Sequence, residues 1–354
     1  LFIGENLKKR NLYLIVKKLS GWQTASLAAF FFAVIPYNVF SSSTILPGPF
    51  MVFGTLGLYY FFLKWLENEK NIVFFLLSVV FANLAILSWP SALFFLFPPI
   101  YLVWQKHGLK ALLKPQLWLF AALSLAPFLA WRAWIARFPE GIPNYQFLIN
   151  EGNIRFKGAF FRWLIAERMG KLILTVCGFA LFVLGLIKKP EGKENYFYFA
   201  YLTSAVIYFT AFASGNVRHD YYQVPFVPIA AIFMAIGTKI LLFPPKELIN
   251  KYISRAVAVF LIVFMMAFGY FEVKGFYWIN KPEIVEAGKA VDRLLPQDAT
   301  VVAPYGGDAA LLYQTNRRGY PITDRQLDQY IEQGTKYFVS VDVNDAGIPN
   351  LAED

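Results

Sequence analysis

Two residue types capable of acid–base chemistry lie beside an arginine at the start of a long apolar run. The segment "GNVRHDYYQVPFVPIAAIFMAIG" contains Arg218, His219, Asp220, Tyr221 and Tyr222 before its apolar part. Arginine and histidine can bind an anionic group, tyrosines can stack on a sugar or lipid, and aspartate can orient a hydroxyl. The alternative is an ordinary polar collar at a membrane interface, with the tyrosines in the aromatic belt. Both interpretations stay open until the side that these residues face is known.

The composition indicates a membrane protein with several spans. Of 354 residues, 57% are hydrophobic and only 16% are charged, and apolar runs near bilayer-crossing length recur along the chain. Pro90, Pro98 and Pro99 predict broken geometry in the fourth of these runs. We expect a polytopic α-helical membrane protein with about nine visible spans, at 23–40, 48–66, 71–88, 91–105, 116–135, 171–187, 196–213, 222–243 and 254–273.

The distribution of lysine and arginine predicts the orientation of these spans. Basic residues gather in alternate loops, for example around 106–114 and 188–193, whereas the opposite short loops contain Arg218 as their only basic residue. Because cytoplasmic loops carry the excess of positive charge, the segment from Arg218 to Tyr222 is expected to face outward. This distribution accounts for the net charge of +10 without a nucleic-acid partner. We expect an integral membrane protein, most simply of a bacterial plasma membrane.

A long polar segment, 136–170, is also predicted to lie on the outer side. Apolar residues from Phe156 to Ile165 are spaced as on an amphipathic helix that would lie along the interface. Arg155, Arg162 and Arg168 interleave with them, and these outward cations require compensation. An anionic ligand would supply it, and so would pairing with glutamates such as Glu151 and Glu167.

The two parts of the chain differ in composition. The expected multi-span part is 1–273. Residues 274–354 are expected to form a small extracytoplasmic α/β domain, and we expect this domain to be truncated at its end. Helical patterns near 281–296, 307–315 and 324–334 alternate there with strand-like "TVVAP" and "KYFVSVD". Asp308 is expected to cap the second helix, and Gly334 to end the third.

Several kinds of site are not supported by the sequence. The two histidines, His107 and His219, are predicted to face opposite sides, which excludes a multi-histidine metal site. Cys177 lies within an apolar run, where a small buried apolar role is expected. "PYGGDAALL" lacks the lysine of a phosphate-binding loop. We therefore expect no cofactor, and the visible residues give no support for a divalent metal.

Several segments together resemble the dolichyl-phosphate-mannose protein mannosyltransferase family, which includes the lipid A aminoarabinose transferases and belongs to the GT-C superfamily. The similar segments are "YLIVKKLSGWQTASLAAFFFAVIPYNVFSSSTILPGPF", "FPEGIP…FRWLIAERMGKLIL" and "RHDYYQVPFVP". The resemblance implies inverting sugar transfer from a polyprenyl-phosphate donor to an acceptor on the outer face. It places the segment from Arg218 to Tyr222 beside a lipid-phosphate cavity. The acceptor is then a lipid, a glycan or a protein.

The family pattern also includes features that this chain does not match. An acidic residue in the family's first outer loop acts as the base or orients the acceptor, and this sequence is expected to begin after that loop. The expected catalytic acid therefore lies upstream of Leu1. Where many relatives have a lysine after the span equivalent to 71–88, this chain has "SWPSA". Two other classes stay open: a lipid or polysaccharide transporter or flippase, and a non-catalytic membrane scaffold.

Overall fold

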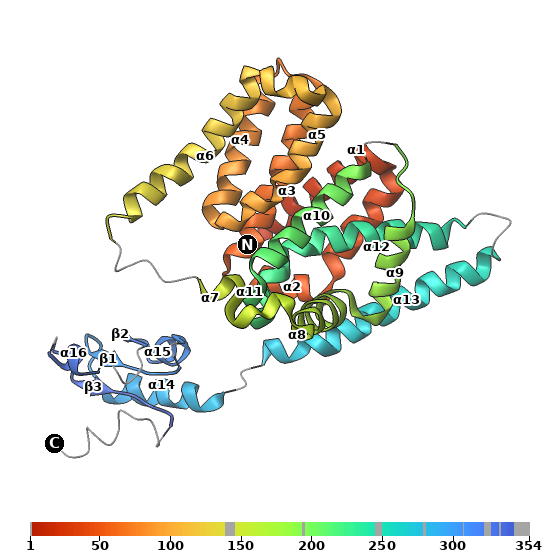
Figure 1. Cartoon of the computed structure of the whole chain (residues 1–354). Helices are drawn as coiled ribbons and strands as arrows, with labels where there is room; N and C mark the ends of the chain where they lie inside the picture. The colour runs from red at the N-terminus through yellow and green to blue at the C-terminus, as the bar shows by residue number, and fades with distance from the viewer. Residues whose placement is uncertain are drawn as a thin grey trace. The chain divides into compact units, whose positions relative to one another are not determined.

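The computed structural model describes residues 2–138, 146–192, 195–244, 250–278, 281–306, 308–321, 327–332 and 334–342, most of them in helices. The chain divides into two compact units, Leu1–Lys274 and Gly275–Asp354 (Figure 1). The predicted outer loop 136–170 is only partly covered, because 139–145 lie outside the described residues.

The first unit is helical throughout its described elements. Its longer helices are α1 (Phe2–Val34), α3 (Pro47–Glu67), α4 (Ile72–Ser88), α5 (Phe97–His107), α6 (Pro115–Ile135), α9 (Thr175–Ile187), α10 (Tyr196–Ala211), α12 (Val227–Leu242) and α13 (Lys251–Val273). Shorter elements connect them: α2 (Pro36–Ser43), η1 (Pro90–Leu96), η2 (Gly108–Leu113), α7 (Phe147–Asn150), η4 (Glu151–Phe156), α8 (Gly158–Phe161), η5 (Arg162–Leu174), α11 (Ala213–Arg218), η7 (Asp220–Phe226) and η8 (Lys274–Tyr277).

Five helical stretches in the described residues are long and apolar enough to cross a membrane, or six if the bent pair α1–α2 counts as one span. They are Pro47–Glu67, Pro115–Ile135, Gly158–Ile187, Asp220–Leu242 and the stretch that begins at Lys251 and contains α13. The predicted nine spans are not confirmed, since α4, α5 and α10 are shorter than a full crossing. The break expected in the fourth span is present, where η1 precedes α5.

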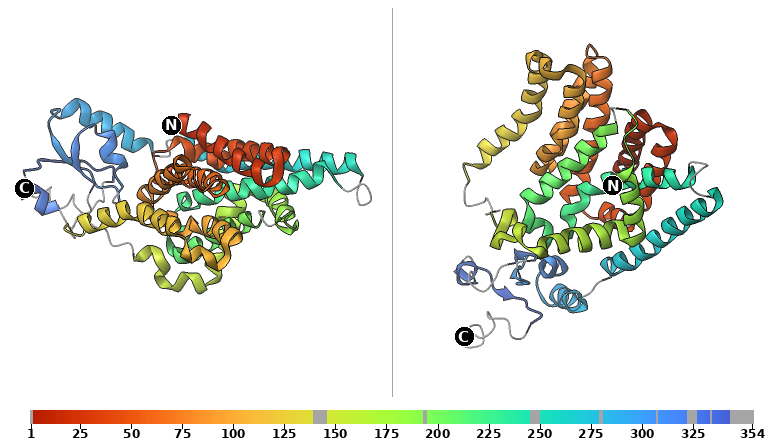
Figure 2. Two further views of the ribbon diagram at one scale, coloured as in Figure 1. Left: turned by 90° about the horizontal axis from the view of Figure 1, so that it is seen from above. Right: turned by 45° about the vertical axis from the view of Figure 1, so that its right-hand side comes forward.

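Helix α12 is the buried centre of this unit and lies against both α1 and α9 (Figures 1 and 2). A Cβ on Gly237 of α12 would lie 2.0 Å from the carbonyl oxygen of Leu181 in α9, so only glycine permits this approach. In a membrane the hydrophobic effect does not drive helices together, so their association depends on close packing, which small residues permit. Gly237 therefore fixes the spacing of α9 and α12.

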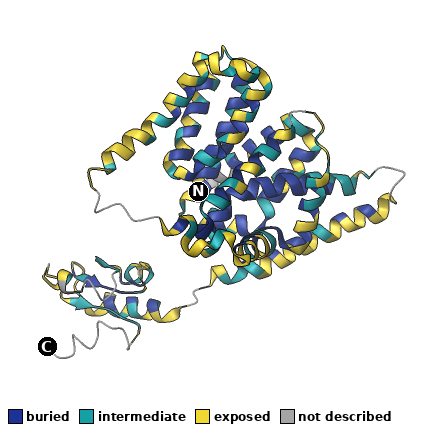
Figure 3. Ribbon diagram, in the orientation of Figure 1, coloured by how far each residue is buried: buried dark blue, intermediate teal, exposed yellow. Residues whose placement is uncertain are grey.

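Two helices instead expose their apolar side chains (Figure 3). In the apolar window of α6 only 11% of residues are buried, against 78% for the stretch that contains α12. Trp118 of α6 and Phe264 of α13 are among the large exposed side chains. Apolar exposure on this scale is unusual for a protein surrounded by water. It fits helices whose outer faces contact lipid.

Charged residues on the side predicted to be cytoplasmic form an ion-pair network. Glu69 lies 2.6 Å from the Nζ atoms of Lys106 and Lys114 and 2.9 Å from Nε2 of His107. Burial alone would raise the pKa of Glu69, but the lysine hydrogen bonds and the charges of Lys106 and His107 lower it to about 2. The network ties the turn after α3 to the end of α5 and the start of α6.

The second unit contains the expected small parallel sheet. Strands β1 (Thr300–Val302), β2 (Arg318–Tyr320) and β3 (Tyr337–Phe338) pair in the order β2-β1-β3. The helices are α14 (Pro282–Leu294), α15 (Ala310–Gln314) and α16 (Leu327–Glu332). The Asp308 carboxylate accepts a hydrogen bond from the Ala310 amide at 2.8 Å, and Gly334 has φ +89° after α16. Gly334 follows α16 in the left-handed conformation expected at a helix end, whereas the N-cap of α15 is Ala309, one residue after the predicted Asp308. Strand β2 was not anticipated.

Candidate functional site

The polar segment predicted to face outward occupies the junction of α11 and η7. His219 is extended, with φ −114° and ψ 128°, and separates α11 from η7. Behind it, Nε2 of the buried Gln223 donates hydrogen bonds to the backbone oxygen of Asn216 at 2.8 Å and to its Oδ1 at 3.0 Å. These buried bonds hold the junction in shape and leave the segment from Arg218 to Tyr221 partly exposed.

Arg218 is paired with a residue from the long segment that precedes α9. Its guanidinium forms an ion pair with the Glu151 carboxylate and lies 5.9 Å from the ring of Phe147. Both charged side chains remain about half exposed, at 50% and 48%. The Glu151 amide donates to the Ser214 hydroxyl at 2.6 Å, which attaches η4 to α11. An exposed pair of this kind is weak, so an incoming anion can compete with Glu151 for Arg218.

Arg168 reaches the same junction from η5. One of its terminal nitrogens, Nη2, donates to the carbonyl oxygens of Val217 at 3.2 Å and Arg218 at 3.4 Å. These carbonyls end α11, so Arg168 acts as a C-terminal cation for that helix. Its Nε atom is buried and has no hydrogen-bond partner among the described residues. Arg168 therefore has one unsatisfied donor, which a ligand can reach only after the side chain moves.

Arg155 approaches α11 at its other end. Its Nη2 donates to the carbonyl oxygen of Ala211 at 3.1 Å, and its own amide donates to the Asn150 side chain at 2.9 Å. As in Arg168, Nε is buried and unpaired within the described part of the chain. Buried donors without partners are rare in native proteins and call for an explanation such as a bound polar group.

A tyrosine that sequence reasoning did not select joins the cluster. The Tyr37 hydroxyl, at the start of α2, donates a 2.7 Å hydrogen bond to the backbone oxygen of Asp220. It also lies close enough to Arg168 and to the Asp220 carboxylate to interact with both electrostatically. The available signal was its place in "IPYNVFSSS", the segment after the first apolar run, predicted to face outward.

The aromatic residues of the segment form a stacked group. The His219 ring lies 5.5 Å from that of Tyr222 and 5.3 Å from that of Tyr221. Tyr222 is buried and packs edge-on against Trp89 at 5.1 Å. Burial lowers the pKa of His219, and the charges of Arg218 and Arg168 lower it further, against the opposing effect of Asp220. His219 is therefore uncharged at neutral pH and can donate one hydrogen bond.

The structure does not bring every predicted residue to this cluster. Arg162 is exposed, and neither Arg162 nor Glu167 makes a hydrogen bond or ion pair with a described residue. The expected amphipathic helix is also corrected: Lys157 is extended, with φ −107° and ψ 146°, so Phe156 belongs to η4 and the helix begins at Gly158. We define the outer cluster as Tyr37, Arg155, Arg168, Arg218, His219, Asp220, Tyr221 and Tyr222.

A large apolar pocket lies in the same helical unit. It has a volume of about 380 Å³ and is lined mainly by α5, η2 and α6, with Ile86 and Leu96 also in its wall. Ile86 precedes Trp89 by one helical turn. The pocket wall is made almost entirely of aliphatic and aromatic side chains, so it suits a hydrocarbon chain.

Carboxylates, histidines and Cys177 do not gather into a metal site in the part of the chain that the structure describes. No group of three or more such residues is close enough together there to hold an ion. What the outer cluster offers is arginine and aromatic side chains, which recognise an anion attached to a larger organic group.

Comparison with known proteins adds a family and a fold. Residues 10–134 match the family model of dolichyl-phosphate-mannose-protein mannosyltransferase. The fold is similar to the crystal structure of ArnT from Cupriavidus metallidurans bound to undecaprenyl phosphate, with a TM-score of 0.60 and 12% sequence identity. The similarity covers 91% of this chain and 70% of that one. No curated protein sequence matches the chain.

The two findings confirm the resemblance to GT-C membrane glycosyltransferases. The family model matches the first part of the chain, and the shared fold extends over most of it. At 12% identity the structural similarity establishes the fold alone. The family match ends within α6, before Arg155 and the other residues of η4, η5, α11 and η7, so it does not assign roles to them.

Proposed function

We propose that this protein is a glycosyltransferase that moves a sugar from a polyprenyl-phosphate donor to an acceptor on the outer face of the membrane. The observation that carries the proposal is the outer cluster itself. Arg155 and Arg168 have buried Nε donors without partners in the described residues, and Arg218 has only an exposed ion pair. The ArnT structure with a similar fold is bound to undecaprenyl phosphate, a ligand with the anion that such a cluster would recognise.

In this proposal the donor phosphate binds Arg168 and Arg218, and His219 donates a third hydrogen bond. The phosphate gains negative charge as the bond between sugar C1 and phosphate oxygen breaks. Fixed cations and N–H donors around it therefore stabilise the transition state more than the bound donor. Attack by the acceptor hydroxyl from the opposite face inverts C1.

The polyprenyl chain and the sugar of the donor would each contact a different surface of the protein. The polyprenyl chain would occupy the apolar pocket near Trp118 and Ile86, and the sugar would stack on Tyr221, which is partly exposed. Asp220 would orient a sugar or acceptor hydroxyl. Activation of the acceptor is assigned to the acidic residue that the family pattern places in its first outer loop.

Sugar transfer tests this proposal directly. The protein expressed from its natural gene would be reconstituted with undecaprenyl-phosphate-linked hexoses and pentoses and with envelope lipids as acceptors. We expect one donor to be consumed with release of undecaprenyl phosphate. The Arg218→Ala variant should lose donor use far more than it loses expression. Equal transfer by wild type and variant would remove Arg218 from the mechanism, and movement of intact donor across the membrane would instead support a transporter.

A further inference from the structure

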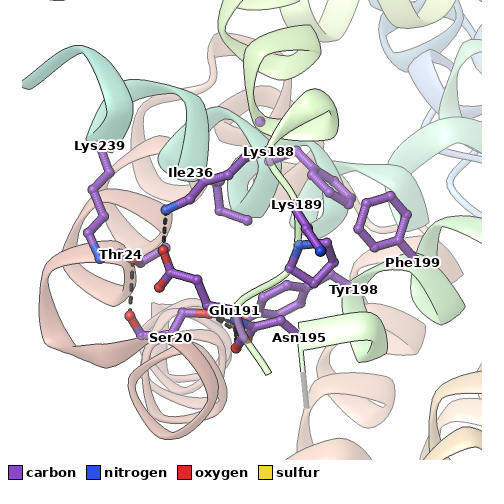
Figure 4. A pocket seen from close by; sticks show the side chains of 13 residues that line it. Ser20, Thr24, Lys188, Lys189, Glu191, Asn195, Tyr198, Phe199, Ile236 and Lys239 are labelled. Carbon is purple, nitrogen blue, oxygen red and sulfur yellow. Dashed lines mark hydrogen bonds and ion pairs between the residues drawn. The ribbon is translucent and has the colours of Figure 1, made fainter. Parts of the chain in front are cut away.

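A second pocket lies at the opposite end of α12 from the outer cluster. It is lined by α1, the segment after α9, α10 and the end of α12, and its polar residues include Lys188, Lys189, Glu191 and Lys239 (Figure 4). At 1.5 Å per residue, Lys239 is about 18 Å along the helix from Val227, the first residue of α12. The pocket is thus separate from the outer cluster.

Positive charge in this pocket exceeds negative charge. Lys188 pairs with Glu191 at 2.6 Å, and the hydrogen bond and charge of Lys188 lower the pKa of Glu191, against burial and with help from Lys239. Lys189 and Lys239 make no hydrogen bond or ion pair with a described residue. One carboxylate therefore faces three ammonium groups, and two of these are available to a ligand.

The floor of the pocket is an ordered polar surface. The Ser20 hydroxyl donates to Oδ1 of Asn195 at 2.9 Å and shares a 2.9 Å hydrogen bond with the buried Tyr198 hydroxyl. Nδ2 of Asn195 donates to the backbone oxygen of Glu191 at 2.8 Å, which positions the acidic residue. These bonds link α1 to α10 directly beneath the lysines.

Apolar side chains complete the wall. Phe199, Phe233 and Ile236 line the same pocket, which has a volume of about 30 Å³, so that only part of a ligand, such as a phosphate group, can enter it. A free inorganic anion would make no favourable contact with these apolar side chains. A ligand that combines an anionic headgroup with a hydrocarbon chain would use both surfaces.

From this arrangement we infer a second lipid site, in which Lys188, Lys189 and Lys239 bind the phosphate of an anionic phospholipid. Lysines at the ends of membrane helices commonly extend toward water, but here the segment after α9 and the end of α12 place three of them around one pocket. Basic pockets between spans on the cytoplasmic side bind anionic lipid headgroups. This is the side on which the lysine distribution predicts the pocket to lie. The inference does not rest on the proposed transferase activity.

Native mass spectrometry of the purified full chain can test the site. Phosphatidylglycerol, phosphatidylcholine and inorganic phosphate would be titrated separately against the wild type and the Lys189→Gln/Lys239→Gln variant. The double substitution leaves the Lys188–Glu191 pair in place. Loss of two lysine contacts should weaken phosphatidylglycerol binding about 30-fold and leave phosphatidylcholine binding unchanged.

A matched control separates a site from general surface charge. The Lys70→Gln/Lys110→Gln variant removes the same charge from exposed positions on the same predicted side, and it should bind phosphatidylglycerol as the wild type does. Equal weakening in both double variants would overturn the inference, and so would equal affinity of the wild type for both lipids. Inorganic phosphate that displaces phosphatidylglycerol at low millimolar concentration would assign the pocket to a soluble phosphate instead.

Discussion

Replacing Arg168 by glutamine should weaken binding of undecaprenyl phosphate by a factor of about 10 to 150. In the structure, Nη2 of Arg168 is committed to the carbonyl oxygens of Val217 and Arg218, whereas Nε is buried without a partner in the described residues. At least one charge-assisted hydrogen bond to the phosphate is then lost. Such a bond contributes about 1.5–3 kcal/mol, and each 1.4 kcal/mol is tenfold in the dissociation constant.

The assay is a titration of purified protein in detergent micelles with undecaprenyl phosphate, followed by native mass spectrometry. Arg162→Gln is the matched control, because Arg162 is exposed on the same helical element and makes no hydrogen bond or ion pair with a described residue. It should change the affinity less than twofold. Arg168→Lys keeps the charge and should fall between wild type and Arg168→Gln. If Arg168→Gln and Arg162→Gln bind equally well while both melt within a few degrees of wild type, Arg168 does not contact the phosphate.

Three further predictions concern stability, each read by thermal melting. Glu69 has a folded pKa of about 2, below its ordinary 4.5, so its contribution to folding stability is complete above pH 4.5 and is lost as the pH falls toward 2. Glu69→Gln should reduce this loss of stability at low pH. Parallel curves of melting temperature against pH for wild type and variant would contradict the ion network. Gly237→Val should cost at least about 1–3 kcal/mol by overpacking against the Leu181 carbonyl, whereas Gly158→Ala, which meets nothing within 4 Å, should be neutral. Burial and nearby arginines lower the pKa of His219 in the folded protein. Protonation below pH 6.5 therefore favours the unfolded chain, and the melting temperature should decline there. If His219→Gln shows the same decline, another group is responsible for it.

The sequence predicted the general fold because its strongest signals are composition and charge distribution. Apolar runs identified the membrane helices, and proline positions identified the break before α5. The predicted number of spans is not confirmed, because hydropathy alone does not determine the length of helices such as α4, α5 and α10, which have 17, 11 and 16 residues. Strand β2 was missed because Arg318 and Gly319 are unlike a buried strand. Gly319 is required there, since a Cβ would lie 1.9 Å from the Val301 carbonyl oxygen.

Contacts among the candidate residues could be predicted from the sequence where the residues are adjacent, but not where packing selects the partners. The group from Arg218 to Tyr222 could be found because it directly precedes an apolar run. That Arg218 would pair with Glu151, 67 positions earlier, and that Arg168 would end α11 depend on how η4 and η5 fold against α11. Tyr37 shows the same limit, since its contact with Asp220 joins segments 183 positions apart.

The central claim is that a polyprenyl phosphate binds at the outer cluster, and photocrosslinking tests it most directly. An undecaprenyl-phosphate analogue with a photoreactive group next to the phosphate would be irradiated with the purified protein, and the modified peptides identified by mass spectrometry. The account predicts labelling of peptides that contain Arg168 or the segment from Arg218 to Tyr222, reduced in Arg168→Gln. Labelling confined to the peptides around Lys188 and Lys239, or equally strong in Arg168→Gln, would contradict it.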